Sequence, residues 1–188
     1  MLFLFCRCSR TNPSLFFTSS NKEGTIFQWD RRQAAYKPAL KYNICKLVSV
    51  IFSANSWHLS VCVMGYSLFE AKIEGVGSGP IGGVKPILSF DINQNDLVLC
   101  GGTELVDEDS YLLFWDVRST KLLGAYWESH SDDITTVKFS PVNGTYLATG
   151  STDGLLNVFN LVATTEDDAL EYSFNTESSV VSGEMRVF

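Results

Sequence analysis

The 188 residues are 45% apolar and 19% charged, a balance that supports a folded domain with a core and excludes general disorder. Aspartate and glutamate outnumber lysine and arginine by 21 to 14, which gives a net charge of −7. The basic residues form no cluster, so we expect no binding to nucleic acid. Aromatic residues make up 13% of the chain and favour strands as the material of the core.

The cysteines and the first residues of the chain indicate the cellular compartment to which the protein is suited. The five cysteines are scattered, include no Cys-x-x-Cys pair, and have only two histidines to assist them. We therefore expect no metal site and free thiols in a reducing compartment. The apolar start stops at Arg7, too early for the core of a signal peptide. Both observations predict an intracellular protein, cytoplasmic or nuclear.

The first predicted strands lie within residues 1–40. An apolar strand begins at Leu15, a polar turn with Gly24 follows, and a second strand ends in Trp29-Asp30. Two apolar runs separated by such a turn are typical of a β-hairpin. We expect residues 1–40 to form part of one structural unit that ends at Trp29-Asp30.

Residues 41–83 fit no clear pattern. Leu47 to Phe69 carries no charged residue and is long enough to span a bilayer, but polar residues from Asn55 to His58 interrupt it, which favours buried strands over a membrane-associated chain. Gly77 to Gly82 matches G-x-G-x-x-G, but neighbouring prolines exclude the helix that a dinucleotide site needs, so we expect a linker. The region is either a degenerate repeat of three strands or an insertion from a faulty gene model.

Two further hairpins of the same design occupy residues 84–121 and 122–165. Their second strands end in Trp115-Asp116 and Phe159-Asn160, which are 44 residues apart. A period of about 40–45 residues is typical of four-stranded propeller blades. We expect one blade in each of these ranges and an acidic, irregular tail over 166–188.

The order of short motifs in the last hairpin points to a family. His130, then Thr152-Asp153-Gly154, then Phe159-Asn160 resembles the GH…DG…WD order of the WD-repeat β-propeller family. The string from Gly124 to Thr135 strengthens this resemblance. It implies an all-β chain, namely an incomplete propeller of two to four four-stranded antiparallel blades. It also implies a non-catalytic scaffold that mediates protein–protein interactions through blade-end loops and needs no cofactor.

The resemblance also implies a buried staple of hydrogen-bonded side chains in each blade. By position, its members are His130, Ser151, Asp153, Trp115 and Trp29. Phe159 takes the tryptophan position in the last repeat and has no ring N–H to donate. His130, Asp153 and Ser151 also permit a hydrolase hypothesis. No nucleophile elbow or oxyanion loop accompanies them, so we expect no enzymatic activity.

Two acidic loops carry the functional prediction. In an antiparallel meander, the turn between the second and third strands opens at the same end as the entry into the first strand. We therefore expect six carboxylates at one end of neighbouring blades: Glu104, Asp107, Glu108, Asp109, Asp132 and Asp133. They form either a binding site for basic segments of other proteins or a solvated acidic rim. Neither nucleic acid nor a membrane is an expected partner.

Overall fold

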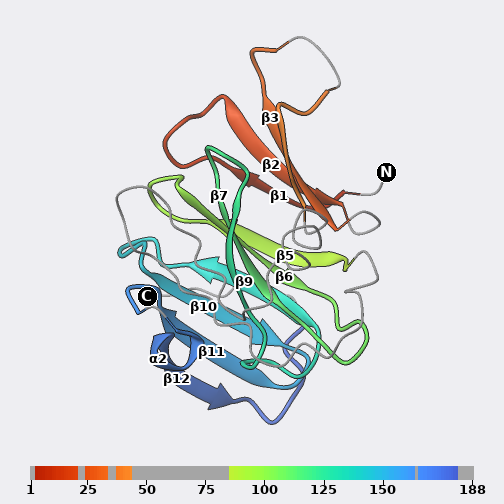
Figure 1. The fold of residues 1–188 in the computed structure, drawn as a ribbon, viewed down its shortest axis with the longest axis vertical. Coiled ribbons are helices and arrows are strands. Elements are labelled where there is room, and N and C mark those ends of the chain that lie inside the picture. The colour runs from red at the N-terminus through yellow and green to blue at the C-terminus, as the bar shows by residue number, and fades with distance from the viewer. Residues whose placement is uncertain (1–2, 21–23, 34–36, 44–84, 164, 182–188) are drawn as a thin grey trace, which may run out of the picture.

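The computed structural model describes residues 3–20, 24–33, 37–43, 85–163 and 165–181, and these ranges are almost entirely β (Figure 1). They form three four-stranded antiparallel sheets. The first sheet contains β1 (Phe3–Cys8), β2 (Leu15–Ser20), β3 (Thr25–Asp30) and β4 (Leu40–Asn43). Residues 44–84 lie outside the described ranges, and with them the apolar stretch 47–69 and the glycine motif.

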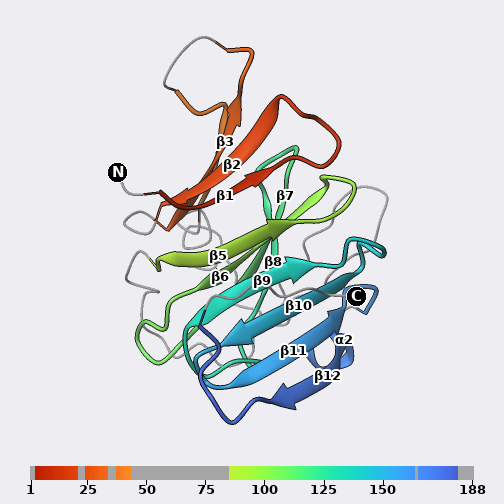
Figure 2. The same cartoon turned by 180° about the vertical axis from the view of Figure 1, so that it is seen from behind.

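The second and third sheets follow the same plan. The second contains β5 (Ile87–Ile92), β6 (Val98–Thr103), β7 (Leu112–Asp116) and β8 (Leu122–Tyr126). The third contains β9 (Ile134–Phe139), β10 (Tyr146–Ser151), β11 (Leu155–Asn160) and β12 (Leu170–Asn175), with the short helix α2 (Glu166–Ala169) before β12. The first strands of the three sheets, β1, β5 and β9, lie side by side (Figure 2). Among the described residues, no helix is long and apolar enough to cross a membrane.

The sequence repeat and the sheet are offset by one strand. We expected residues 122–165 to form one blade that begins with its outer strand, but β8 pairs with β7 and belongs to the second sheet. The third sheet takes its outer strand from Leu170–Asn175 instead. The reason is geometric: a chain that leaves the outer edge of one sheet crosses directly to the innermost strand of the next.

The segment predicted to be an irregular tail, 166–188, is regular at its start. The Thr165 hydroxyl accepts the Asp168 N–H and caps α2. β12 then pairs with β11 from Leu170 to Asn175. The prediction was wrong here because the acidic composition hid a strand that satisfies the free edge of β11. The outer edge of the third sheet is therefore β12.

Two apolar cores separate the three sheets. Successive residues of β7 point to opposite faces, so Leu113 and Trp115 enter the core shared with the first sheet. Leu112 and Phe114 enter the core shared with the third sheet. All five residues of β7 are buried as a result. The second sheet is therefore covered on both faces, which explains why β7 reads as a continuous apolar run.

Asp91 connects all three sheets. Its carboxylate lies 3.5 Å from Arg7 Nε and 3.4 Å from the Arg10 guanidinium, beside the first sheet. It also accepts the Phe139 N–H of β9 at 2.9 Å. Two residues earlier, on the same face of β5, the Ser89 hydroxyl accepts the Val137 N–H at 2.9 Å. Polar side chains of β5 thus fix the positions of its two neighbouring inner strands.

We predict that Asp91→Ala lowers the free energy of unfolding by about 2–3 kcal/mol, because a buried N–H loses its acceptor and two arginines lose their counterion. Urea denaturation measures the change. Glu128→Gln, at an exposed carboxylate, serves as the control and should leave the midpoint unchanged. Equal midpoints for the two variants would contradict a bridging role for Asp91.

Candidate functional site

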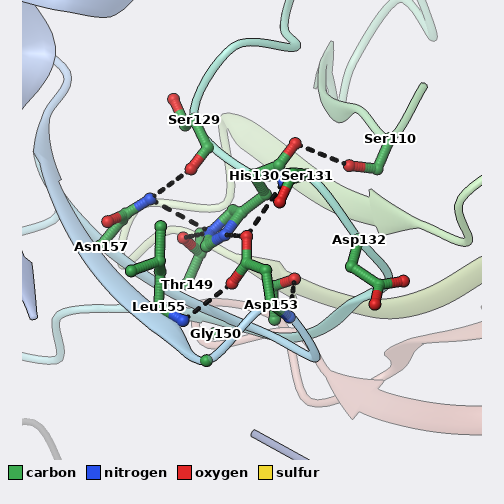
Figure 3. A network of polar contacts seen from close by, with 12 residues as sticks. Ser110, Ser129, His130, Ser131, Asp132, Thr149, Gly150, Asp153, Leu155 and Asn157 are labelled. Carbon is green, nitrogen blue, oxygen red and sulfur yellow. Dashed lines mark hydrogen bonds and ion pairs between the residues drawn. The ribbon is translucent and has the colours of Figure 1, made fainter. Parts of the chain in front are cut away.

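His130 lies at the centre of a buried polar network (Figure 3). Its Nδ1 is 3.0 Å from Asp153 Oδ2, and its Nε2 is 2.7 Å from Thr149 Oγ1. The Asp153 carboxylate also accepts the N–H groups of Ser131 and Leu155, at 3.0 and 2.8 Å. A neutral ring that donates from Nδ1 to the carboxylate accepts the threonine hydroxyl at Nε2. The network joins the loop before β9 to the turn between β10 and β11.

The hydroxyl partner of His130 is Thr149, where the sequence had suggested Ser151. Both residues lie on the same face of β10, because side chains two positions apart point the same way. The Ser151 hydroxyl instead accepts the Asp153 N–H at 3.2 Å and shapes the turn. Sequence reasoning also missed Asn157, whose Nδ2 donates to the Ser129 carbonyl at 2.7 Å. Its position between apolar residues of the same strand was the available signal in the sequence.

In the other two sheets, the tryptophans of the staple differ in their hydrogen bonding. Trp29 Nε1 donates to Thr18 Oγ1 at 2.9 Å in the first sheet. Trp115 Nε1 is buried without a partner in the second sheet. The strand registers explain the difference, since Gly101 occupies the place in β6 that Thr18 has in β2. A Cβ atom at Gly101 would lie 3.2 Å from the Trp115 ring.

The network offers little to a hydrolase. His130 is 6% exposed, and the hydroxyl on its ring belongs to Thr149, which is fully buried. Burial lowers the pKa of His130, although the Asp153 carboxylate acts in the opposite direction. The pKa of Asp153 is also lowered, because the backbone N–H groups of Leu155 and Ser131 and the His130 ring outweigh the effect of burial. Within the described residues, no group of three or more His, Cys, Asp or Glu side chains could hold a metal ion.

The residues just before His130 are held by a half-buried carboxylate. Glu166 of α2 accepts the N–H groups of Trp127, Glu128 and Ser129 at 2.9, 3.1 and 2.9 Å, together with the Ser129 hydroxyl. Burial raises the pKa of Glu166 despite these donors. The contact fixes the course of the chain from β8 into the His130 loop.

The two acidic loops lie side by side, as the strand topology had predicted. Asp133 Oδ1 accepts the Leu105 N–H at 2.8 Å, and the Ser110 hydroxyl donates to the His130 carbonyl at 3.1 Å. These two bonds join the loop between β6 and β7 to the loop before β9. The two loops that carry the six acidic residues are therefore joined to each other, and the acidic end face stays a prediction.

The six acidic residues divide into two groups. Asp107, Glu108 and Asp109 are exposed at the tip of the first loop, whereas Glu104, Asp132 and Asp133 are half-buried. Asp107 and Glu108 have φ angles of 55° and 68°, which places the loop tip in a tight left-handed turn. We call the three exposed carboxylates, Asp107 to Asp109, the acidic tip.

The buried ammonium group of Lys85 holds the backbone of the acidic tip. Its ammonium group donates to the carbonyls of Val106 and Asp109 at 2.6 and 2.7 Å and lies 4.4 Å from the Tyr111 ring centre. Burial lowers the pKa of Lys85, although Asp109 and Asp107 oppose this shift. The Tyr111 hydroxyl donates to the Asp109 carboxylate at 3.1 Å. The tip is thus a fixed loop on a buried cation.

Part of this chain matches a known protein family. The model of the WD domain, G-beta repeat, matches residues 121–160, which contain β8 to β11. The chain carries a WD repeat over these residues. The match begins at the outer strand of the second sheet, so it has the same one-strand offset as the fold. The expected all-β, incomplete propeller is confirmed.

Curated relatives of this WD-repeat chain are longer than it is. An uncharacterized WD repeat-containing protein of Saccharomyces cerevisiae, YNL035C, is 28% identical over 180 residues, which cover 91% of this chain and 46% of the relative. The WD repeat-containing protein 89 homolog of Dictyostelium discoideum is 29% identical over 94 residues, covering 50% of this chain and 24% of that protein. The chain spans less than half the length of both relatives.

A solved structure also has a similar fold. The crystal structure of the RRP9 WD40 repeats matches with a TM-score of 0.59 at 14% identity, covering 91% of this chain and 38% of that one, which supports the fold alone.

We predict that His130→Ala lowers the free energy of unfolding by about 1.5–3 kcal/mol, because Asp153 and Thr149 lose a buried partner. Thermal and urea midpoints measure this loss. Ser131→Ala is the matched control, since Ser131 is exposed and keeps its N–H bond to Asp153. Midpoints that do not differ between the two variants would rule out a structural role for the ring.

We also predict that His130 makes stability depend on pH. Since its pKa is lowered from the ordinary value of 6.5 in the folded chain, the unfolded chain binds a proton first as the pH falls. The stability that the neutral ring contributes is present above about pH 6.5 and decreases as the pH falls below it. Unfolding free energies at about pH 7.5 and about pH 5.5 should differ more in the parent than in His130→Gln. Equal differences would contradict the lowered pKa.

Proposed function

We propose that this WD-repeat chain is a non-catalytic scaffold that binds a basic segment of another protein at the acidic tip and the adjoining loop 130–133. WD-repeat proteins generally act as scaffolds for protein interactions. The observation that carries the proposal is the position of three exposed carboxylates on a loop bonded to the neighbouring sheet.

The fixed shape of the loop supports a binding role. Lys85 holds two of its carbonyls and Asp133 holds the N–H of Leu105, so little conformational freedom remains to be lost when a partner binds. The buried Lys85 ammonium offsets one of the three negative charges, so the acidic tip keeps a net negative charge. This exposed negative charge can steer a basic partner.

The cysteines support the proposed intracellular setting. Cys6, Cys8 and Cys100 are free thiols in the described part of the chain, and burial raises the pKa of Cys100 well above its ordinary value. A protonated, buried thiol of this kind is a small apolar side chain. Free thiols of which two are exposed suit a reducing compartment.

We predict that the triple change Asp107→Asn, Glu108→Gln and Asp109→Asn abolishes capture of the basic partner while leaving the melting temperature unchanged. The parent should release the same partner when the salt concentration rises from about 0.05 M to about 0.5 M, because screening shortens the range of charge attraction. Affinity capture from cell extract with quantitative mass spectrometry measures both effects.

A control with the same change in net charge separates the acidic tip from charge in general. Glu128→Gln, Asp167→Asn and Glu177→Gln remove three exposed carboxylates at other sites. This control should retain the partner that the tip variant loses. A partner whose binding ignores both salt and the tip would contradict the proposal.

A further inference from the structure

The turn from β9 to β10 contains the only Asn-Gly pair of the sequence, Asn143-Gly144. The Asn143 N–H donates to the Ser140 hydroxyl at 3.2 Å, and the Asn143 carbonyl accepts the Tyr146 N–H at 3.0 Å. Asn143 is itself exposed. The turn therefore holds the backbone of Asn143 and leaves the residue accessible to water.

Thr145 donates two hydrogen bonds to the side chain of Asn143. Its N–H and its hydroxyl both reach Asn143 Oδ1, at 3.1 and 2.8 Å. The backbone N–H identifies this atom as the oxygen, because the nitrogen of a side-chain amide does not accept hydrogen bonds. Among the described residues, none accepts a hydrogen bond from Asn143 Nδ2. The amide oxygen is thus held by two donors, and the described residues do not hold its nitrogen.

Four other asparagines form the same kind of turn without these additions. In each, the side-chain oxygen accepts the N–H group of the residue two positions later. No hydroxyl of a described residue donates to any of these four oxygens. The residues that follow them are proline, aspartate, leucine and threonine, in the order Asn12, Asn95, Asn160 and Asn175. Asn143 differs from all four in its second donor and in the glycine that follows it.

The fold does not require glycine at position 144. A Cβ atom there would lie 3.5 Å from Gln94, an ordinary van der Waals distance, and the φ angle of Gly144 is not in the left-handed region. Without a side chain, however, the backbone nitrogen of Gly144 can approach the neighbouring Asn143 Cγ closely. A bond between these two atoms closes a five-membered ring.

We propose that this turn promotes the deamidation of its own Asn143. The Gly144 nitrogen gives its proton to water or hydroxide and bonds to Asn143 Cγ, which moves the electrons of the C=O double bond onto Oδ1. The Thr145 N–H and hydroxyl stabilise the resulting oxyanion, because hydrogen bonds to a charged oxygen are stronger than those to a neutral amide. The Cγ–Nδ2 bond then breaks, and Nδ2 takes up a proton from water and leaves as ammonia.

Water completes the reaction. Ring closure gives a succinimide, and addition of one water molecule to either of its carbonyls gives aspartate or isoaspartate at position 143. Aspartate keeps an oxygen in the place of Oδ1, so both bonds from Thr145 persist. Isoaspartate adds one carbon to the backbone, which displaces the carbonyl that accepts the Tyr146 N–H. An aged chain should therefore melt at a lower temperature than the Asn143→Asp variant.

The first experiment follows the reaction in the 188-residue chain at neutral pH, and in an unstructured synthetic peptide of residues 138–148. Peptide mapping by mass spectrometry measures the fraction of each asparagine that has reacted. We expect Asn143 to deamidate about tenfold faster in the folded chain than in the peptide, since only the folded turn places both donors on Oδ1. The four asparagines that lack the second donor and the glycine should stay unmodified over the same period.

The second experiment separates the contribution of Thr145 from that of the Asn-Gly pair. Thr145→Val keeps the backbone N–H and the shape of the side chain but removes the hydroxyl, so it should slow the reaction about fivefold in the folded chain and leave the rate in the peptide unchanged. Thr145→Ser retains a hydroxyl and should restore most of the rate. Gly144→Ala should slow the reaction in both the chain and the peptide.

Three results would overturn the proposal. The first is an Asn143 that reacts no faster in the folded chain than in the peptide, since the turn would then restrain the side chain instead of activating it. This comparison uses the parent alone, so it decides the matter even where a variant fails to fold. The second is a folded Thr145→Val variant that reacts at the rate of the parent, or that is slowed equally in the peptide. The third is an aged chain, rich in isoaspartate, that melts at the same temperature as Asn143→Asp.

Discussion

Each sheet of this protein is a single layer and cannot bury its own apolar faces, so every sheet depends on its neighbours. The second sheet meets this constraint fully, and β7, buried along its whole length, is the result. Asp91 and Ser89 reinforce the stack at the inner strands, where bonds from one sheet reach the backbone of the next. The face-to-face contact thus sets both the spacing of the sheets and the direction in which the stack grows.

The same contact determines where the polar groups can act. Side chains that point along the stack are used for burial, so polar interactions collect at the strand ends, in the loops around His130 and the acidic tip. Glu166 and Asp153 each accept several N–H groups there, and Asp133 accepts one N–H from the loop of the neighbouring sheet. The loops that would meet a partner are therefore fixed by half-buried carboxylates that accept backbone N–H groups, whereas the exposed Asp109 carboxylate accepts a side-chain hydroxyl, that of Tyr111.

Much of this arrangement could be predicted from the sequence. The 44-residue spacing of Trp115 and Phe159 and the turn at Gly154 indicated the repeat, and the meander rule brought the acidic loops together. It was harder to predict which strands pair, because the sequence of an apolar strand such as Leu122–Tyr126 does not indicate which of the two neighbouring sheets it joins. Thr149 and Ser151 share one face of β10, so period-two alternation could not choose between them as the partner of His130. β12 was missed although Leu170, Tyr172 and Phe174 alternate with polar residues, because the acidic run just before it suggested an irregular tail.

The one-strand offset between repeat and sheet has an evolutionary consequence. β12 presents Phe174 beside Leu156 just as β8 presents Tyr126 beside Leu112. A deletion that began before β8 and ended before β12 would remove the last strand of one sheet and the first three of another, yet β12 could take the vacated edge. Duplication or loss of four consecutive strands can therefore change the number of sheets wherever in the repeat it begins. The strand that follows such a change meets an edge equivalent to the one that it had before.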